Sequence, residues 1–378
     1  MNRLRTILLI VLCACIFHDA GARSVKVALI LPFDVASGTP KVNYLDFYAG
    51  ALLAVENQRN AGADIRLTVI DLPDLNEDDS ELNDGLFAND FIIGPVSAAE
   101  MLLIQRICRL CGTAFVSPLD PYAEDFVTDN PRFFQIPTSP ERQAANLVAR
   151  LKAEGDGPVT LFCNPVSPQE ERIRARYEKA LREAGIEYRT ISYEVLKGRL
   201  ITEELRERMN PGDKPLPQRV LVASEDEAFA SDVVRNMSLL VSLYNIPVTL
   251  YASNRLRSFE TIDVTNLYKL GLRVSTPYFV DYSREETRDF VLKYRALYNT
   301  EPSQYAFQGY DVLTYFIATF NDLGDAFFDF VEYYPMDLLQ NSIRFVRAEE
   351  EGGYLNIHTR DIEYRPDNTI RIVTDPAL

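Results

Sequence analysis

The chain has 378 residues, with 55 acidic and 39 basic side chains and a formal net charge of −16 at pH 7. Phosphate binding requires a positive surface, so this balance argues against nucleic acid and anionic membranes as partners. A hydrophobic fraction of 47% is typical of a globular protein, and the length suggests two domains of about 150–200 residues each. The sequence contains only two histidines, which leaves little for histidine-based metal sites or a Ser-His-Asp triad.

The first 22 residues have the pattern of an export signal. Arg3 and Arg5 precede an apolar run at residues 7–17, and Ala20-Gly21-Ala22 has the small residues of a cleavage site. The run is too short to cross a bilayer as a helix, which needs about 20 residues. We expect cleavage after Ala22, a net charge of −17 thereafter, and a location in the periplasm or cell envelope with no transmembrane span. A lipoprotein signal with a lipid anchor at Cys15 is the alternative.

Apolar runs alternate with helical patterns along the rest of the chain. The runs are near-continuous, which is typical of strands buried on both faces of a parallel sheet. We predict strands at residues 25–31, 65–71, 91–95, 113–117, 159–163, 188–193, 219–224, 247–253 and 272–280. We predict helices at residues 44–60, 97–111, from 139, 167–185, 225–244, 283–298 and 303–322, and a hairpin over the last 30 residues, with strands at 353–364 and 369–373.

Helix starts carry recognisable capping sequences. In a capping box, a serine and a glutamate three residues later each bond to the other's backbone N–H. The predicted boxes are Ser97 with Glu100, Ser167 with Glu170, and Ser283 with Glu286. Strand–helix alternation of this regularity predicts an α/β fold with doubly wound parallel sheets, whose ligands bind beyond the carboxyl ends of the strands.

A series of segments resembles, in order, segments of the type I periplasmic solute-binding proteins, in the branch that binds leucine, isoleucine and valine. The segments are VALILP at 27–32, YAGALLAVE at 48–56, FIIGPVS at 91–97, FVSP at 115–118, FFQIP at 133–137, YRALY at 294–298 and QGYD at 308–311. The resemblance implies two doubly wound parallel-sheet lobes joined by three crossings, the first near residues 133–137. Lobe 1 would comprise residues 24–138 and 279–340, and lobe 2 residues 139–278 and 341–378.

The same resemblance implies a function. The protein would capture a small polar solute, amino-acid-like or other, between its lobes and present it to an ABC permease or another envelope protein, for uptake or sensing. The sequence has no G-x-S-x-G, H-E-x-x-H or phosphate-binding glycine loop, so we predict a binding protein and not an enzyme, with no cofactor and no metal.

Candidate ligand-binding residues of lobe 1 lie at predicted strand ends and turns. They are Asp71, Ser97, Ser117 and Leu119. Ser97 could hold an anion at a helix N-terminus or act only as a cap. In amino-acid-binding relatives the turn after Ser117 holds the ligand's carboxylate, but here Pro121 replaces an expected serine or threonine and has neither hydroxyl nor N–H.

Candidate residues of lobe 2 are Asn164, Glu225, Asn254 and Tyr278. Relatives place an acidic residue near Asn254, against the ligand's ammonium, so this neutral side chain is a departure. Glu225 could supply the missing charge, or it could belong to the acidic start of a helix, which the helix dipole favours.

The alternative function is an envelope interaction module that reuses the fold without transport, similar to lipoprotein activators of cell-wall synthases. The departures at Pro121 and Asn254 and a lipid at Cys15 would fit it. Cys108 and Cys111 have the spacing of a redox pair or half a zinc site, but they lie at the end of a predicted helix, so we favour buried core cysteines.

Overall fold

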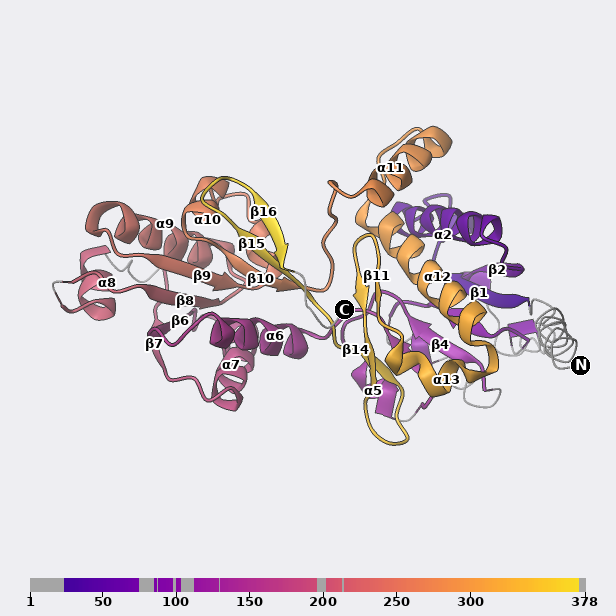
Figure 1. Cartoon of the computed structure of the whole chain (residues 1–378), viewed down its shortest axis with the longest axis horizontal. Coiled ribbons are helices and arrows are strands. Elements are labelled where there is room, and N and C mark those ends of the chain that lie inside the picture. Colours follow the sequence, from indigo (N-terminus) through magenta and orange to yellow (C-terminus); the bar gives the residue numbers. More distant parts are fainter. Residues whose placement is uncertain are drawn as a thin grey trace, which may run out of the picture. The chain divides into compact units, whose positions relative to one another are not determined.

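The structure, a computed structural model, describes residues 24–74, 85–86, 88–97, 100–102, 112–128, 130–195, 202–212 and 214–373. The predicted export signal, the lipidation candidate Cys15, and Cys108 and Cys111 lie outside these residues. The chain divides into two compact units (Figure 1). Unit 1 comprises the residues up to Pro137 together with Asp281–Asn356, and unit 2 comprises Thr138–Val280 and the residues from Ile357 onward. The chain therefore passes from one unit to the other three times.

Unit 1 is built on a seven-stranded sheet in the order β13-β14-β5-β4-β3-β1-β2. All neighbours pair in parallel except β13 and β14. The strands are β1 (Val25–Leu31), β2 (Ile65–Asp71), β3 (Phe91–Ile93), β4 (Ala114–Ser117), β5 (Phe133–Gln135), β13 (Phe345–Arg347) and β14 (Tyr354–Asn356). Its helices are α2 (Val42–Asn60), α5 (Glu124–Thr128), α11 (Glu285–Tyr298), α12 (Gln304–Leu323) and α13 (Phe327–Phe330), and a small ribbon joins β11 (Met336–Asp337) to β12 (Ser342–Ile343).

Strand β1 shows why the predicted strands are near-continuous apolar runs. Val27, Leu29 and Leu31 belong to one hydrophobic cluster. Ala28 and Ile30, which point to the other face of the sheet, belong to a second cluster. Both faces are buried from Val27 to Leu31, so no position in this part of the strand favours a polar side chain, and the one charged residue, Lys26, stands near the start and is only partly buried.

Helices α2 and α12 pack along each other in unit 1 (Figure 1). A Cβ atom on Gly50 would lie 1.8 Å from the carbonyl oxygen of Ala306, and one on Gly309 would lie 1.9 Å from that of Phe47. The two helix backbones therefore meet through a pair of glycines, and no larger residue fits at either position.

Asp311, in the same helix α12, is completely buried and holds the segment after β11. Its carboxylate accepts the backbone N–H groups of Leu339 (3.0 Å), Gln340 (2.9 Å) and Asn341 (2.9 Å). The GYD sequence thus supplies both a helix contact and an anchor for a loop within unit 1.

Unit 2 is built on a second seven-stranded sheet, in the order β16-β15-β10-β9-β8-β6-β7. The five strands from β6 to β10 are parallel. They are β6 (Val159–Cys163), β7 (Tyr188–Ser192), β8 (Gln218–Ala223), β9 (Val248–Ala252) and β10 (Arg273–Thr276), followed by the antiparallel β15 (Arg360–Tyr364) and β16 (Ile370–Val373). Its helices are α6 (Pro140–Ala153), α7 (Pro168–Glu183), α8 (Thr202–Met209), α9 (Glu227–Tyr244) and α10 (Val264–Lys269). The prediction of two doubly wound α/β sheets is confirmed.

Two predicted boundaries were wrong. Residues 354–356 pair with β5 in unit 1, so the segment 341–356 belongs to unit 1 and not to lobe 2, and the terminal hairpin begins only at β15. The first crossing lies at Pro137 and Thr138, as expected from the segment 133–137, whose residues 133–135 form a strand of the unit 1 sheet. Strand β10 ends at Thr276 rather than at residue 280.

One predicted helix start was also wrong. The N-cap of α11 is Arg284, whose side chain makes no capping bond. Ser283 instead donates its N–H and its hydroxyl to Asp281, at 2.9 and 2.6 Å. An aspartate two residues earlier therefore competes successfully for the serine that would have closed the box.

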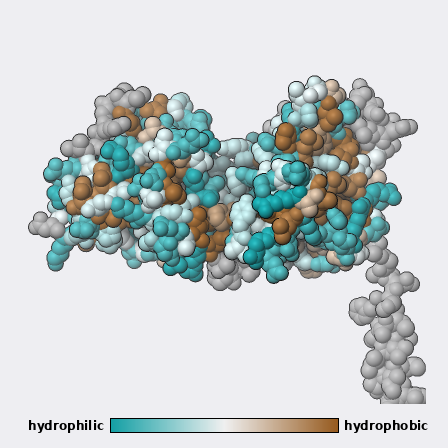
Figure 2. Space-filling model, turned by 90° about the horizontal axis from the view of Figure 1, so that it is seen from above, coloured by the Kyte–Doolittle hydropathy of each residue, from teal (hydrophilic) through white to brown (hydrophobic). Residues whose placement is uncertain are grey.

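On the face drawn in Figure 2, hydrophobic residues form small groups among hydrophilic ones on both units. Among the described residues, no helix is both long and apolar enough to cross a membrane.

Candidate functional site

The parallel strands of unit 2 bring several polar side chains to one edge of the sheet. Strands β6, β8 and β9 are neighbours, with Cys163 opposite Ala223 and Val222 opposite Ala252. Asn164, Ser224 and Ser253 therefore follow their strands at the same edge. The order β7-β6-β8 reverses direction between β6 and β8, and ligands of open α/β sheets bind at such a switch point.

Three of the polar atoms at this edge are buried without a hydrogen-bond partner among the described residues. They are Oδ1 of Asn164, Oε2 of Glu170 and Oγ of Ser253. Asn164 and Glu170 are 4% and 6% exposed. A buried unpaired polar group costs about 1–3 kcal/mol. Such groups are unusual in native structures, and these three lie at or beside the ends of neighbouring strands, while others, such as Ser117 Oγ, occur in unit 1.

Glu170 reaches this edge from the first turn of α7. The Ser167 hydroxyl accepts the Glu170 N–H at 3.2 Å, as in the predicted capping box. The Glu170 carboxylate does not return the bond: its Oε1 accepts the N–H of Glu225, after β8, at 3.2 Å. The glutamate therefore joins the start of α7 to the end of the neighbouring strand.

The edge is acidic. Burial raises the pKa of the Glu170 carboxyl, and the nearby charges of Asp226 and Glu225 raise it further, against hydrogen bonds from Ser224 and Glu225 that lower it. Asp226 is the N-cap of α9 and accepts the Phe229 N–H at 2.8 Å. Glu225 lies half-buried just before that cap, outside the first helical turn.

The other two candidates in unit 2 are engaged locally. The side-chain oxygen of Asn254 accepts a hydrogen bond from Arg257 at 2.9 Å within the short 3-10 helix Asn254–Ser258. Tyr278 is half-buried beyond β10, and its carbonyl accepts the Thr276 hydroxyl at 3.0 Å.

In unit 1, Asp71 and Ser97 have structural partners. Asp71 ends β2, and its carboxylate accepts the N–H groups of Asp34 and Val35 at 3.0 Å each, which fixes the turn after β1. The capping box of Ser97 is formed: its N–H donates to Glu100 Oε2 at 2.9 Å, and its hydroxyl accepts the Glu100 N–H at 3.4 Å. Ser97 is exposed.

The turn after β4 is closed on the protein itself. Ser117 is completely buried, and its hydroxyl has no partner among the described residues. The carbonyls of Pro118 and Pro121 accept the side chains of Gln308 (2.8 Å) and Gln135 (3.3 Å). Leu119 is partly buried against the unit 1 core. The carbonyls of Pro118 and Pro121 are thus taken by side chains of unit 1, and the Ser117 hydroxyl is left without a partner.

Of the residues at this edge, Asn164 and Glu225 were among the candidates from the sequence, and Glu170 and Ser253 were not. The available signal for Ser253 was its place at the end of a predicted strand. Glu170 was assigned to a capping box, and nothing in that motif indicated its contact with the N–H of Glu225. Among the described residues, no group of His, Cys, Asp and Glu could hold a metal ion. Cys163 is a buried free thiol whose pKa is raised by burial.

Comparison with solved structures identifies the fold. A putative branched-chain amino acid ABC transporter protein from Rhodospirillum rubrum superposes with a TM-score of 0.68 at 18% identity, over 93% of this chain and 100% of that one. A periplasmic ligand-binding protein of a branched-chain amino acid ABC transporter from Burkholderia xenovorans gives 0.57 at 12% identity, over 93% and 94%. The C-domain of LpoA from Haemophilus influenzae, a regulator of PBP1A, gives 0.55 at 14% identity, over 92% and 100%. No family model and no curated protein matches the sequence.

The protein therefore has the α/β fold of the type I periplasmic binding proteins, in which the predicted leucine-binding-like branch is represented. One of the proteins with this fold is described as a regulator and not as a transporter protein.

Proposed function

We propose that the protein is an exported, non-enzymatic receptor for a small polar solute, in ABC-type uptake or in sensing. The observation that carries the proposal is the set of unpaired buried oxygens of Asn164, Glu170 and Ser253 at the switch point of unit 2. A solute with hydrogen-bond donors would satisfy these atoms on binding and remove their desolvation cost.

The proposal is tested by a thermal-shift screen of amino acids, short peptides, sugars and nucleosides at millimolar concentration. A ligand at 100 times its Kd stabilises the folded state by about 2.7 kcal/mol, which is a shift of several degrees. Absence of any shift across the screen contradicts a solute receptor.

Variants locate the site once a solute is found. Asn164→Ala and Glu170→Gln should reduce the ligand-induced shift. Glu204→Gln serves as the control, because Glu204 is an exposed glutamate on α8 that pairs with Arg208. Equal shifts in all three variants would place binding elsewhere.

We also propose that the chain is exported to the periplasm or cell envelope and processed after Ala22. The N-terminal sequence of the secreted protein tests this, since processing there leaves Arg23 first. A lipid-modified Cys15 as the first residue would instead support the lipoprotein alternative.

The second candidate function is an envelope regulatory module. It is favoured by the turn after Ser117, where the carbonyls of Pro118 and Pro121 already accept hydrogen bonds from Gln308 and Gln135. The regulator from Haemophilus influenzae provides an example of such a role in the same fold. Recovery of a stable envelope partner without added solute, together with no hit in the solute screen, would favour this function.

A further inference from the structure

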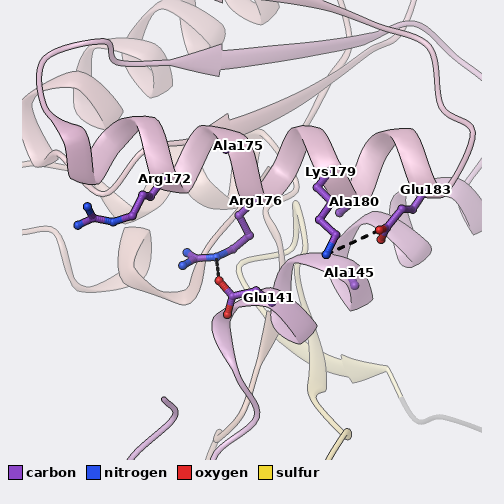
Figure 3. A pocket seen from close by; sticks show the side chains of 8 residues that line it. All are labelled: Glu141, Ala145, Arg172, Ala175, Arg176, Lys179, Ala180 and Glu183. Atoms are coloured by element: carbon purple, nitrogen blue, oxygen red, sulfur yellow. Dashed lines mark hydrogen bonds and ion pairs between the residues drawn. The ribbon is translucent and has the colours of Figure 1, made fainter. Parts of the chain in front are cut away.

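A groove of about 350 Å³ lies between helices α6 and α7 of unit 2. Alanines form its floor, and longer charged side chains stand around them (Figure 3). The lining residues are Glu141 and Ala145 of α6 and Arg172, Ala175, Arg176, Lys179, Ala180 and Glu183 of α7. The two helices pack through their other faces, where Ile173, Tyr177 and Leu181 are buried, so these charged side chains are not needed for the core.

The cations follow one stripe of α7. Arg172, Arg176 and Lys179 are separated by four and three residues, which places them on the same helix face. Figure 3 shows Arg172 and Arg176 extending in the same direction. The lining of the groove contains three cations and two carboxylates, whereas the chain as a whole has a net charge of −16. The groove is thus a local exception to the acidity of the protein.

These cations are available to a ligand. Arg172 is exposed and makes no hydrogen bond or ion pair with any described residue. Arg176 is held by Glu141 through a 2.9 Å bond to its Nε, which orders the side chain and leaves both terminal nitrogens to donate. Lys179 is only loosely paired, with 3.8 Å to Glu183, and its side chain is 68% exposed. Guanidinium groups with open terminal N–H groups bind carboxylates in a bidentate manner.

We propose that this groove is a docking surface for a short acidic peptide segment of a partner protein. From Arg172 to Glu183 the helix rises about 16 Å, at 1.5 Å per residue. An extended segment of about five residues covers that length. A single small anion would not span the whole stripe, because Arg172 and Lys179 begin about 10 Å apart along the helix. Glu183 places a negative charge at the other end of the groove, so the segment's acidic residues lie toward Arg172.

This docking surface is independent of the solute site, since its residues differ from those at the strand ends. The test is fluorescence anisotropy with labelled hepta-glutamate, with hepta-lysine as the charge control. We expect hepta-glutamate to bind and hepta-lysine not to bind, with a Kd that rises with salt concentration.

Two variants and one control locate the contact. Arg172→Glu should raise the Kd about tenfold, because it removes an attraction and adds a repulsion. Ala175→Leu should also raise it, by filling the floor while keeping a good helix former. Arg182→Glu makes the same charge change on α7 outside the groove and should alter the Kd less than twofold; circular dichroism checks the fold of each variant.

Several results would overturn the proposal. They are no binding of hepta-glutamate, an equal loss with Arg182→Glu, displacement of the peptide by inorganic phosphate at similar affinity, and binding of phosphatidylserine vesicles in place of the peptide.

Discussion

The close contact between α2 and α12 determines how much a larger residue at Gly309 would destabilise unit 1. Replacement of Gly309 by alanine would place a Cβ atom 1.9 Å from the Phe47 carbonyl oxygen and 2.8 Å from its carbonyl carbon. Ordinary contacts of this kind are longer than about 3.2 Å, so the helices must separate by roughly 1.5 Å. Overpacking of this kind costs about 1–3 kcal/mol, and the lost packing along both helices adds to it. Alanine returns about 1 kcal/mol through helix propensity, so overpacking alone leaves a net loss of up to about 2 kcal/mol, and the lost packing increases it.

Urea unfolding followed by circular dichroism at 222 nm measures this loss. With two compact units the curve is fitted with two transitions, and only the one of unit 1 should move. Gly50→Ala should act similarly, since its Cβ would meet the Ala306 carbonyl oxygen at 1.8 Å. The double variant should cost less than the sum, because one separation of the helices relieves both contacts. Gly212→Ala, with open space around its Cβ, is the control, and a Gly309→Ala protein as stable as that control would refute the reasoning.

Three further predictions concern hydrogen-bonded carboxylates. Asp311→Ala leaves three buried backbone N–H groups without their acceptor and should cost about 3–5 kcal/mol in the unit 1 unfolding transition, with Asp311→Asn less severe. Burial raises the pKa of Glu170 in the folded chain, so stability should fall as pH rises from the ordinary carboxyl range to that raised value, and Glu170→Gln should flatten this fall in a pH series of melting temperatures. Glu154 is the opposite case: burial opposes its charge, but hydrogen bonds from Tyr251 and Arg150 hold its pKa below the usual value. Stability should therefore decrease as pH falls from the ordinary carboxyl range, and a Glu154→Gln variant that keeps the whole acid-side decrease would contradict this assignment.

The central strands of both sheets could be predicted because they are buried on two faces. In β1 every residue from Val27 to Leu31 is apolar and buried, and β6, buried throughout, was predicted with the bounds found in the structure. The weakest predictions concerned short elements whose pairing depends on distant residues. Strand β14 has three residues and pairs with β5, more than 200 positions earlier, so its sequence resembles the start of the later hairpin equally well. Helix α8, in a charged and weakly apolar stretch, was not predicted at all.

The candidate site, too, could be predicted only where it follows from the sheet, and not where it depends on a contact between distant residues. That Asn164 would lie near the residues after β8 follows from the parallel sheet alone, because carboxyl ends of parallel strands share an edge. Glu170 could not be placed in this way, since a glutamate three residues after an N-cap serine has two possible partners. One is the N–H of Ser167, in its own turn, and the other is the N–H of Glu225 on the neighbouring strand end. The three-residue spacing predicts the contact with Ser167, but it carries no information about the contact with Glu225. Because the Glu170 carboxylate bonds to the strand end, it does not complete the cap of α7. It is buried beside acidic neighbours, and its Oε2 is left without a partner. The feature that most supports solute binding therefore arises where the tertiary structure overrides a local motif.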